Sequence, residues 1–172
     1  EVVIHYYGSK FDIPTVNKEF VKLQMEPPSP YKQIDLKMVV GRAFRFESNK
    51  LDYVAEALGF GRKLKTTFEL WVGCMNGDES SWAAMEKYNR RDVALLEKLY
   101  RRLLPWITNH PNQSDGQLLC PKCGSDKTQR RGHQIAILKV YARYHCQACG
   151  GWFRSNQSLI RTNREQGVNI PS

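Results

Sequence analysis

The sequence predicts an α/β domain over residues 1–111 and a small β domain over residues 117–155, with a loose basic tail over residues 156–172. The first domain is predicted because residues 1–7 form a β-branched and aromatic run, as buried strands do, and helical patterns follow them. The second is predicted because two C-x-x-C pairs flank a stretch that alternates as a strand does. The polar residues between the two domains are typical of a linker.

The composition is that of an ordinary globular protein. Hydrophobic residues make up 41% and charged residues 25% of the 172, which excludes a disordered chain. No apolar run approaches the roughly 18–20 residues that a membrane helix needs, and no signal peptide is recognisable, so we expect a cytoplasmic protein without a membrane partner. The chain opens inside an apolar run without Met, and we expect further strands of the sheet upstream of Glu1.

The positive charge is concentrated toward the C-terminus. The chain carries 26 Lys and Arg against 17 Asp and Glu, and residues 117–164 hold nine of these bases with one acid, Asp126. A basic block beside a nearly neutral domain is typical of a nucleic-acid-binding protein, and we expect DNA rather than RNA as the partner. The alternative is a charged tail that is simply solvated.

Helix signals follow the first strand in order. Asp12 is predicted to cap a helix that has Pro14 in its first turn, and Asp35 is predicted to cap the next one. Residues 48–49 are predicted to cap a third helix, which Gly59 ends. The predicted helices span residues 12–24, 35–40, 50–58 and 80–104, with an extended piece at 31–34 and an irregular stretch at 61–78 anchored by Trp71 and Met75.

Two acids stand out by their positions in the predicted elements. Asp12 follows the first strand, and Asp92 lies inside the last predicted helix, one turn after Tyr88 on the same face. Hydrolysis of a phosphodiester by two metal ions needs clustered carboxylates that hold the ions about 3.5–4 Å apart, and a hydroxyl can orient the attacking water. Each residue also has a structural alternative: a helix cap for Asp12, a core aromatic for Tyr88 and an Arg partner for Asp92.

Two motifs carry a resemblance to a known family. Residues 7–14, Tyr-Gly-Ser-Lys-Phe-Asp-Ile-Pro, resemble the second motif of the DEDD 3′–5′ exonucleases. Residues 88–96, which begin Tyr-Asn-Arg-Arg-Asp, resemble the third motif of their tyrosine subtype. Residues 33–36 and 49–55 resemble the connecting helices of phage and bacterial members, and we expect such an origin. The resemblance covers residues 1 to about 108 and implies a ribonuclease H-like fold.

The resemblance also implies a site. Asp12 and Asp92 would be ligands of Mg²⁺ or Mn²⁺, and Tyr88 would position water. The first motif of the family, Asp-x-Glu, is absent before Asp12, and Tyr7 stands where the family often has Asn. We therefore expect residues 1–172 alone to be inactive or nearly so, with the first motif upstream. Asp35 is either an accessory acid or only a helix cap.

Four of the five cysteines form two C-x-x-C pairs, Cys120 with Cys123 and Cys146 with Cys149. Each pair precedes a Gly, which permits the turn that directs both thiolates at one ion. Four thiolates leave a tetrahedral zinc ion no open position, so the predicted zinc site is structural. The other candidates are His133 and His145, which the site does not need, and the lone Cys74, which we expect to be a small buried or loop residue.

The residues between the two pairs alternate as a strand, with Lys139, Tyr141, Arg143 and His145 on one face. Basic and aromatic side chains together can contact phosphates and stack on bases. We therefore predict a nucleic-acid contact by Arg130, Arg131, Lys139, Tyr141 and Arg143. A solvated strand face is the alternative. The arrangement resembles the C-terminal zinc ribbons of transposases and some phage nucleases.

Together these features predict a partial ribonuclease H-like domain followed by a zinc ribbon, in a 3′–5′ exonuclease that uses two metal ions. The first alternative is a nucleic-acid-binding module without catalysis, in which the ribbon binds and the α/β domain is a scaffold. The second is a protein-interaction domain in which zinc only holds a small fold together.

Overall fold

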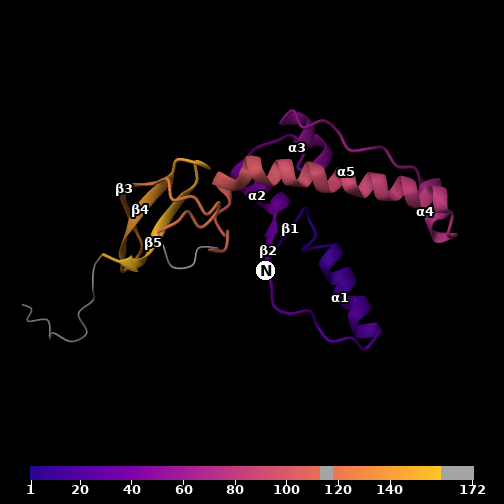
Figure 1. Ribbon diagram of the computed structural model, residues 1–172, viewed down its shortest axis with the longest axis horizontal. Helices are drawn as coiled ribbons and strands as arrows, with labels where there is room; N and C mark the ends of the chain where they lie inside the picture. The colour runs from indigo at the N-terminus through magenta and orange to yellow at the C-terminus, as the bar shows by residue number, and fades with distance from the viewer. Residues whose placement is uncertain (113–117, 160–172) are drawn as a thin grey trace, which may run out of the picture. The chain divides into compact units, whose positions relative to one another are not determined.

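The computed structural model describes residues 1–112 and 118–159, and the chain divides into two compact units between Asn109 and His110 (Figure 1). Most of the predicted linker at 112–117 and most of the predicted tail lie outside the described residues. Each unit contains its own sheet. None of the helices in the described part has both the length and the apolar character needed to cross a membrane.

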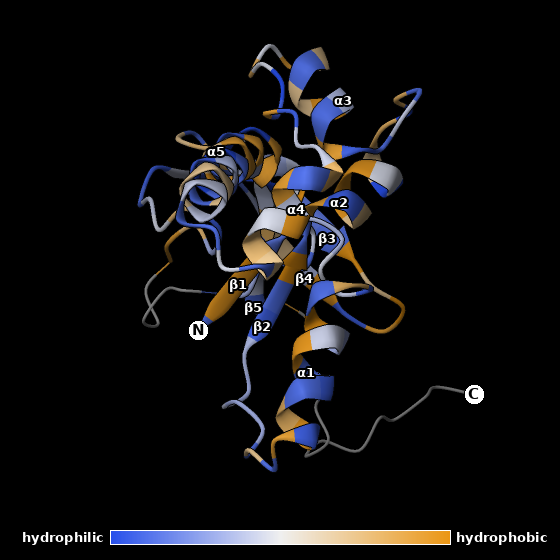
Figure 2. Ribbon diagram, turned by 90° about the vertical axis from the view of Figure 1, so that its right-hand side faces the viewer, coloured by the Kyte–Doolittle hydropathy of each residue, from blue (hydrophilic) through white to orange (hydrophobic). Residues whose placement is uncertain are grey.

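The first unit contains a two-stranded parallel sheet. β1 (Val2–His5) pairs with β2 (Lys32–Asp35) in a register that places His5 opposite Asp35. Parallel strands need a crossover connection, and here it contains helix α1 (Asp12–Lys22). β1 is strongly hydrophobic (Figure 2) and confirms the predicted first strand, while β2 takes the place of the predicted extended piece.

Helix α1 begins differently from its prediction. Its N-cap is Phe11, which makes no side-chain capping hydrogen bond, and Asp12 is the first helical residue. The predicted capping role of Asp12 is therefore wrong, and its carboxylate instead lies at the positive end of the helix dipole. No residue of α1 is buried, and hydrophobic and hydrophilic residues are mixed along it (Figure 2).

Three further helices supply most of the core of the first unit: α2 (Leu36–Ala43), α3 (Leu51–Ala57) and the long α5 (Glu79–Leu103), which continues into the 3₁₀ turn η1 (Leu104–Trp106). α5 confirms the predicted helix at 80–104. Burying apolar side chains is the main stabilising term of such a core. The largest fully buried side chains of the first unit are Ile34, Leu36, Val40, Val54, Leu95, Leu99 and Ile107.

The predicted start of α2 agrees with the structure, whereas the predicted start of α3 does not. Asp35 caps α2 as predicted, because its carboxylate accepts a hydrogen bond from the backbone N–H of Lys37 at 3.0 Å. The cap of α3 is Lys50 and not residues 48–49, and it makes no side-chain capping bond. Gly59 has φ +76° just after α3, a left-handed conformation that favours glycine, and it ends the helix as predicted.

The stretch predicted to be irregular contains a helix, α4 (Phe68–Met75). Its predicted anchors are wrong, because Trp71 is 51% and Met75 87% exposed, whereas Cys74 is 7% exposed. α4 packs against α5, and Gly73 allows this approach because a Cβ at that position would collide with the side chain of Ser81. Figure 1 shows α4 beside the first turns of α5.

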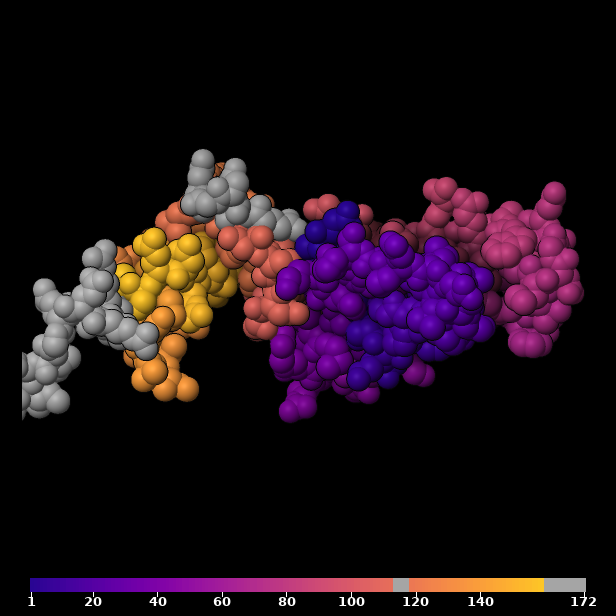
Figure 3. Space-filling model, turned by 90° about the horizontal axis from the view of Figure 1, so that it is seen from below, coloured from indigo at the N-terminus to yellow at the C-terminus, as the bar shows by residue number. Residues whose placement is uncertain are grey.

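The second unit is a three-stranded antiparallel sheet in the order β3 (Thr128–Ile135), β4 (Val140–Cys146) and β5 (Trp152–Ser158). Both pairings contain a register shift. β5 extends two residues past 156, where the loose tail was predicted to begin. Residues of β4 and β5, coloured toward yellow, form a continuous surface of this unit in Figure 3.

Candidate active site and metal centre

Tyr88 and Asp92 lie one turn apart on α5 and share a single cationic partner, Lys63. The Lys63 ammonium donates to the Tyr88 hydroxyl at 2.9 Å and lies 2.6 Å from Oδ2 of Asp92. All three side chains are partly buried, with Lys63 26% and Asp92 22% exposed. The structure therefore places two predicted site residues together and adds a third, because Asp92 pairs with a lysine and not with an Arg.

Both the backbone and the side chain of Lys63 are held by hydrogen bonds. Its backbone N–H donates to Oδ1 of Asp52 at 2.7 Å, so α3 fixes the loop that carries it. Burial alone would lower the pKa of Lys63, but its contacts with Asp92 and Tyr88 outweigh burial and raise that pKa above its ordinary value. The ammonium is therefore charged at neutral pH.

Asp92 has one oxygen without a partner. Its Oδ1 is buried and accepts no hydrogen bond from residues 1–112 or 118–159, whereas Oδ2 contacts Lys63. A buried carboxylate oxygen without a partner costs free energy, and its usual partners are hydrogen-bond donors or a cation. This orphaned oxygen fits a metal ligand.

The surroundings of Asp12 give less support for a role as a metal ligand. Its side chain is exposed at the start of α1 and makes no hydrogen bond or ion pair with the residues that the structure describes. Across residues 1–112 and 118–159, the four paired cysteines are the one group of three or more potential metal ligands whose ligand atoms lie together. Asp12 and Asp92 are thus not brought into a larger carboxylate cluster within the described residues.

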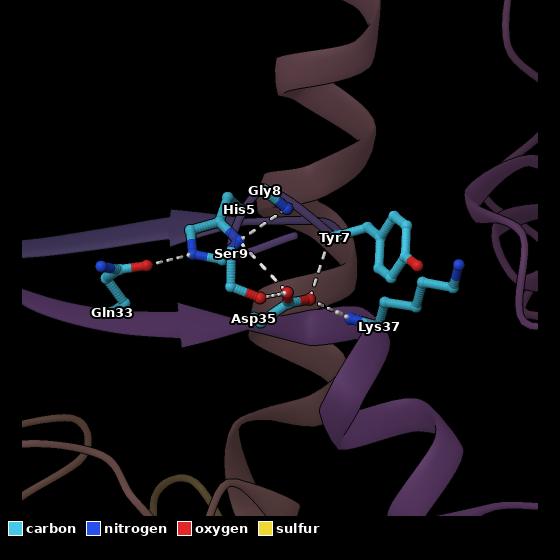
Figure 4. Close-up of polar contacts among 7 residues, drawn as sticks. All are labelled: His5, Tyr7, Gly8, Ser9, Gln33, Asp35 and Lys37. Atoms are coloured by element: carbon cyan, nitrogen blue, oxygen red, sulfur yellow. Dashed lines mark hydrogen bonds and ion pairs between the residues drawn. The ribbon is translucent and has the colours of Figure 1, made fainter. Parts of the chain in front are cut away.

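Asp35 has a structural role that uses both of its oxygens (Figure 4). Oδ1 accepts the backbone N–H of Tyr7 at 2.9 Å as well as that of Lys37, and Oδ2 accepts the Ser9 hydroxyl at 2.6 Å. His5 lies 3.6 Å from Oδ2. Burial would raise the pKa of Asp35, but these hydrogen bonds and the nearby His5 lower it below the usual range. The arrangement favours the helix-cap interpretation of Asp35 over the accessory acid.

The turn after β1 depends on this carboxylate. Tyr7, which stands where the resembling family often has Asn, has φ +68°, a conformation that costs a non-glycine residue free energy. Its N–H is held by Asp35, and its ring lies under the Lys37 ammonium at 3.5 Å from the ring centre. Gly8 follows because a Cβ there would lie 2.9 Å from the His5 ring. Asp35 thus fixes the turn that follows β1 (Figure 4).

The four paired cysteines gather at one end of the second sheet, with all four sulfur atoms within 4.8 Å of one another. The Sγ atoms of Cys120 and Cys149 are 3.7 Å apart, and those of Cys123 and Cys146 are also 3.7 Å apart. A tetrahedral zinc ion with Zn–S bonds of about 2.3 Å requires sulfur separations of about 3.8 Å. The donor set and its spacing fit a zinc ion, and neither His133 nor His145 belongs to the group.

The two C-x-x-C turns have the same backbone geometry. The N–H of Gly124 donates to the carbonyl of Cys120 at 2.8 Å, and the N–H of Gly150 donates to that of Cys146 at 2.9 Å. Both glycines have positive φ, +72° and +73°. The glycine after each pair is therefore required by the turn, as the sequence predicts.

The predicted nucleic-acid residues do not all lie on one face. Tyr141 and Arg143 share a face of β4, but Arg130 pairs with Tyr144 on the other face. Lys139 lies in the turn between β3 and β4, where its carbonyl accepts from Ala136. Trp152 and Arg154, on β5, were missed because the chain after Cys149 lacks an apolar pattern that would indicate a strand.

Comparison with known protein families gives a match, which lies in the first unit. A family model described as the RNase H superfamily matches residues 1–104. The chain belongs to the RNase H superfamily. Enzymes of this superfamily usually hydrolyse nucleic acids, so the match supports a nuclease-type enzyme with a nucleic-acid partner. Searches of curated proteins and of solved structures found no significant match.

Proposed function

We propose that this RNase H superfamily protein is a metal-dependent 3′–5′ exonuclease. The observation that carries the proposal is that Tyr88 and Asp92, one turn apart on α5, share Lys63 as their partner, while Oδ1 of Asp92 is buried without a hydrogen bond among the described residues. A hydroxyl above a carboxylate on one helical face is the pattern of the third motif in the tyrosine subtype of DEDD exonucleases, which these residues resemble. A purely structural pair would have no need of a buried oxygen without a partner.

The residues have distinct roles in this proposal. Asp92 and Asp12 would hold Mg²⁺ or Mn²⁺, and such ions activate water and stabilise the leaving oxygen in phosphodiester hydrolysis. The Tyr88 hydroxyl would orient the attacking water. Lys63 balances the charge of Asp92 through their ion pair. With only these two of the family's acids, residues 1–172 alone are predicted to have little activity.

The second unit would hold one zinc ion through Cys120, Cys123, Cys146 and Cys149. Four thiolates close the coordination sphere, so the ion would stabilise the sheet and take no part in hydrolysis. The sheet would then present its basic residues to nucleic acid, with DNA rather than RNA as the expected substrate. Zinc and the catalytic metal thus belong to different units and different chemistry.

A second candidate function is nucleic-acid binding without catalysis. The observation in its favour is the charge of the second unit, because the nine bases of residues 117–164 are accompanied by a single acid. In that case the first unit would be a scaffold and Lys63 would be a permanent partner of Asp92.

The experiment that separates the two functions uses the natural full-length protein and single-stranded DNA labelled at its 5′ end. A 3′–5′ exonuclease shortens this substrate one nucleotide at a time when Mg²⁺ or Mn²⁺ is added, and releases mononucleotides from 3′-labelled DNA at once. Binding without any shortening, at saturating metal, would exclude the exonuclease and favour the second candidate. Cuts at internal positions would indicate an endonuclease and would equally contradict the proposal.

A further inference from the structure

One face of the second sheet carries five side chains that are aromatic or basic: Tyr141, Arg143 and His145 from β4, and Trp152 and Arg154 from β5. We call them the aromatic–basic face. The register of the strands brings them together, because His145 pairs with Trp152 and Arg143 pairs with Arg154. Directly paired residues of neighbouring strands project from the same face of a sheet.

The rings and guanidinium groups of this face are stacked on one another. The Arg154 guanidinium carbon lies 3.9 Å from the centre of the Tyr141 ring, and that of Arg143 lies 5.0 Å from the centre of the Trp152 ring. The rings of His145 and Trp152 are 4.7 Å apart. Each arginine therefore extends an aromatic surface, while its charge remains available to a phosphate.

The two arginines lack the acidic partners that three exposed arginines of the first unit have. In the first unit Arg62, Arg90 and Arg101 each form an ion pair with a glutamate. Within residues 118–159, neither Arg143 nor Arg154 has an ion pair, and Asp126 is the one acid. Two guanidinium groups without an internal counter-charge favour an anionic ligand.

The opposite face of the same sheet has a different character. Tyr144 and Phe153 stack there at 5.4 Å between ring centres, and Ala142 is 3% exposed. Trp152, on the aromatic–basic face, is 48% exposed. A large ring that is half exposed and lies beside a guanidinium group without an acidic partner is more than a solvated strand face requires.

We propose that the aromatic–basic face binds single-stranded nucleic acid, with unpaired bases stacked on Trp152 and Tyr141 and phosphates bound by Arg143 and Arg154. Stacking on an aromatic side chain needs a base whose flat face is free, which a duplex does not offer along its length. The inference deepens the proposed function, since an exonuclease that removes nucleotides from a 3′ end must hold the single strand that leads to it.

The test measures fluorescence anisotropy of labelled oligo(dT) and oligo(U) of about 20 nucleotides, longer than the roughly 4–16 nucleotides that one single-strand-binding fold covers. It uses the zinc-containing 172-residue chain without added Mg²⁺ or Mn²⁺, so that no hydrolysis is expected. Trp152→Ala should weaken binding by about 5- to 150-fold, the loss of one stacked base. Trp152→Phe retains a ring and should lose less. Binding to a blunt duplex should change by less than either.

The charged partners are tested by salt dependence. Arg143→Gln and Arg154→Gln should each lower the slope of log K against log salt by up to about 0.7, the value for one phosphate contact on a single strand. The matched controls lie on α5: Trp82→Ala, whose ring is 56% exposed, and Arg101→Gln, whose partner is Glu97. Neither control should change affinity or slope.

The inference is overturned if Trp152→Ala binds oligo(dT) as wild type does, if Trp82→Ala weakens binding equally, or if the chain binds duplex in preference to single strands. Zinc content is measured for every variant, because loss of the ion would remove the fold of this sheet. The exonuclease proposal is tested by Asp92→Asn in the shortening assay, whereas this inference is tested by Trp152→Ala in the anisotropy assay without added metal. A failure of the exonuclease proposal and a failure of this inference are therefore seen in different variants.

Discussion

The ammonium of Lys63 lies 2.6 Å from Oδ2 of Asp92 and 2.9 Å from the hydroxyl of Tyr88, so one cation connects both residues of the candidate site on α5. The second oxygen of Asp92 is buried and has no hydrogen-bond partner in the part of the chain that the structure describes. Lys63 therefore places a positive charge beside this carboxylate. A divalent ion at Asp92 would have to act beside Lys63 or displace it.

Replacement of Lys63 tests whether this lysine and a divalent metal ion compete for the carboxylate of Asp92. Lys63→Met removes the only charged partner of Asp92 among the described residues, and we expect the free energy of unfolding to fall by about 1–3 kcal/mol, the usual range for a hydrogen bond to a charged group. Mn²⁺ should bind this variant more tightly than wild type, because the vacated carboxylate oxygen becomes available. Electron paramagnetic resonance of free Mn²⁺ measures the affinity, and thermal unfolding with and without Mn²⁺ measures the stability. Equal Mn²⁺ affinity in both proteins would exclude the competition.

Replacement of Asp12 tests whether this residue is a metal ligand or has a structural role. Because Asp12 is exposed and does not cap α1, Asp12→Asn should change the stability by no more than about 0.5 kcal/mol, as ordinary surface substitutions do. Hydrolysis by the natural full-length protein should nevertheless be lost, since an amide is a poorer and uncharged ligand. Melting temperature and exonuclease rate are measured on the same preparation. A large loss of stability with a normal rate would assign Asp12 a structural role.

Asp35 predicts a pH dependence of stability. Its pKa is lower in the folded chain than the ordinary value of about 4, so folding favours the ionised carboxylate. Its contribution is fully present above that ordinary value and is lost as the pH falls through the lower, folded pKa. Asp35→Asn should therefore be less stable than wild type by about 1–3 kcal/mol at pH 7. The difference should shrink below about pH 4.

Urea unfolding of wild type and Asp35→Asn measures this difference in stability. The measurements run from pH 7 down to about pH 2.5, because carboxylates that accept several hydrogen bonds stay ionised to low pH. Asp12→Asn is the matched control, because it removes a carboxylate that has no partner within the described residues. A difference between wild type and Asp35→Asn that stays constant across this range would contradict the assigned role of the ionised Asp35.

The cysteine centre predicts one zinc ion and a fold that depends on it. Apparent zinc-binding free energies of about 10–16 kcal/mol in small four-ligand domains exceed the stability of a sheet of this size, so a chelator should unfold the second unit and leave the first intact. Cys149→Ser should lose the ion, whereas Cys74→Ala, in α4, should retain it. Zinc analysis and thiol titration measure both. Less than half an equivalent of zinc in untreated wild type, with all four thiols reactive, would exclude the site.

Much of the fold could be predicted because its signals are local. The β-branched run of β1, the cap of α2 at Asp35 and the long amphipathic pattern of α5 each depend on residues close in sequence. The same holds for the cysteine turns, whose glycines have the positive φ that the spacing requires. Helix α4 could not be predicted, because Gly73 looks like a helix breaker until its close contact with Ser81 of α5 is known.

The candidate site shows the same limit. Tyr88 and Asp92 are one turn apart in one helix, so the sequence alone places them together. Lys63 comes from a loop without periodicity, and only its contacts with Asp52 of α3 and Asp92 of α5, both distant in the sequence, place it in the site. The register of β4 and β5 brings Trp152 and Arg154 beside Arg143 and Tyr141. This register could not be predicted, because the sequence does not indicate where β5 begins.

The central claim is that Asp92 holds a catalytic metal ion, and the most direct measurement compares the exonuclease rates of natural full-length wild type, Asp92→Asn and Tyr88→Phe at saturating Mg²⁺. Asp92→Asn should lower the rate by roughly 100-fold or more, because even changes in the outer-shell partners of metal ligands cost about 10–100-fold. Tyr88→Phe keeps the ring and should lower the rate less. Melting temperatures within a few degrees of wild type would show that both variants are folded. An Asp92→Asn protein that retains the wild-type rate would contradict the account.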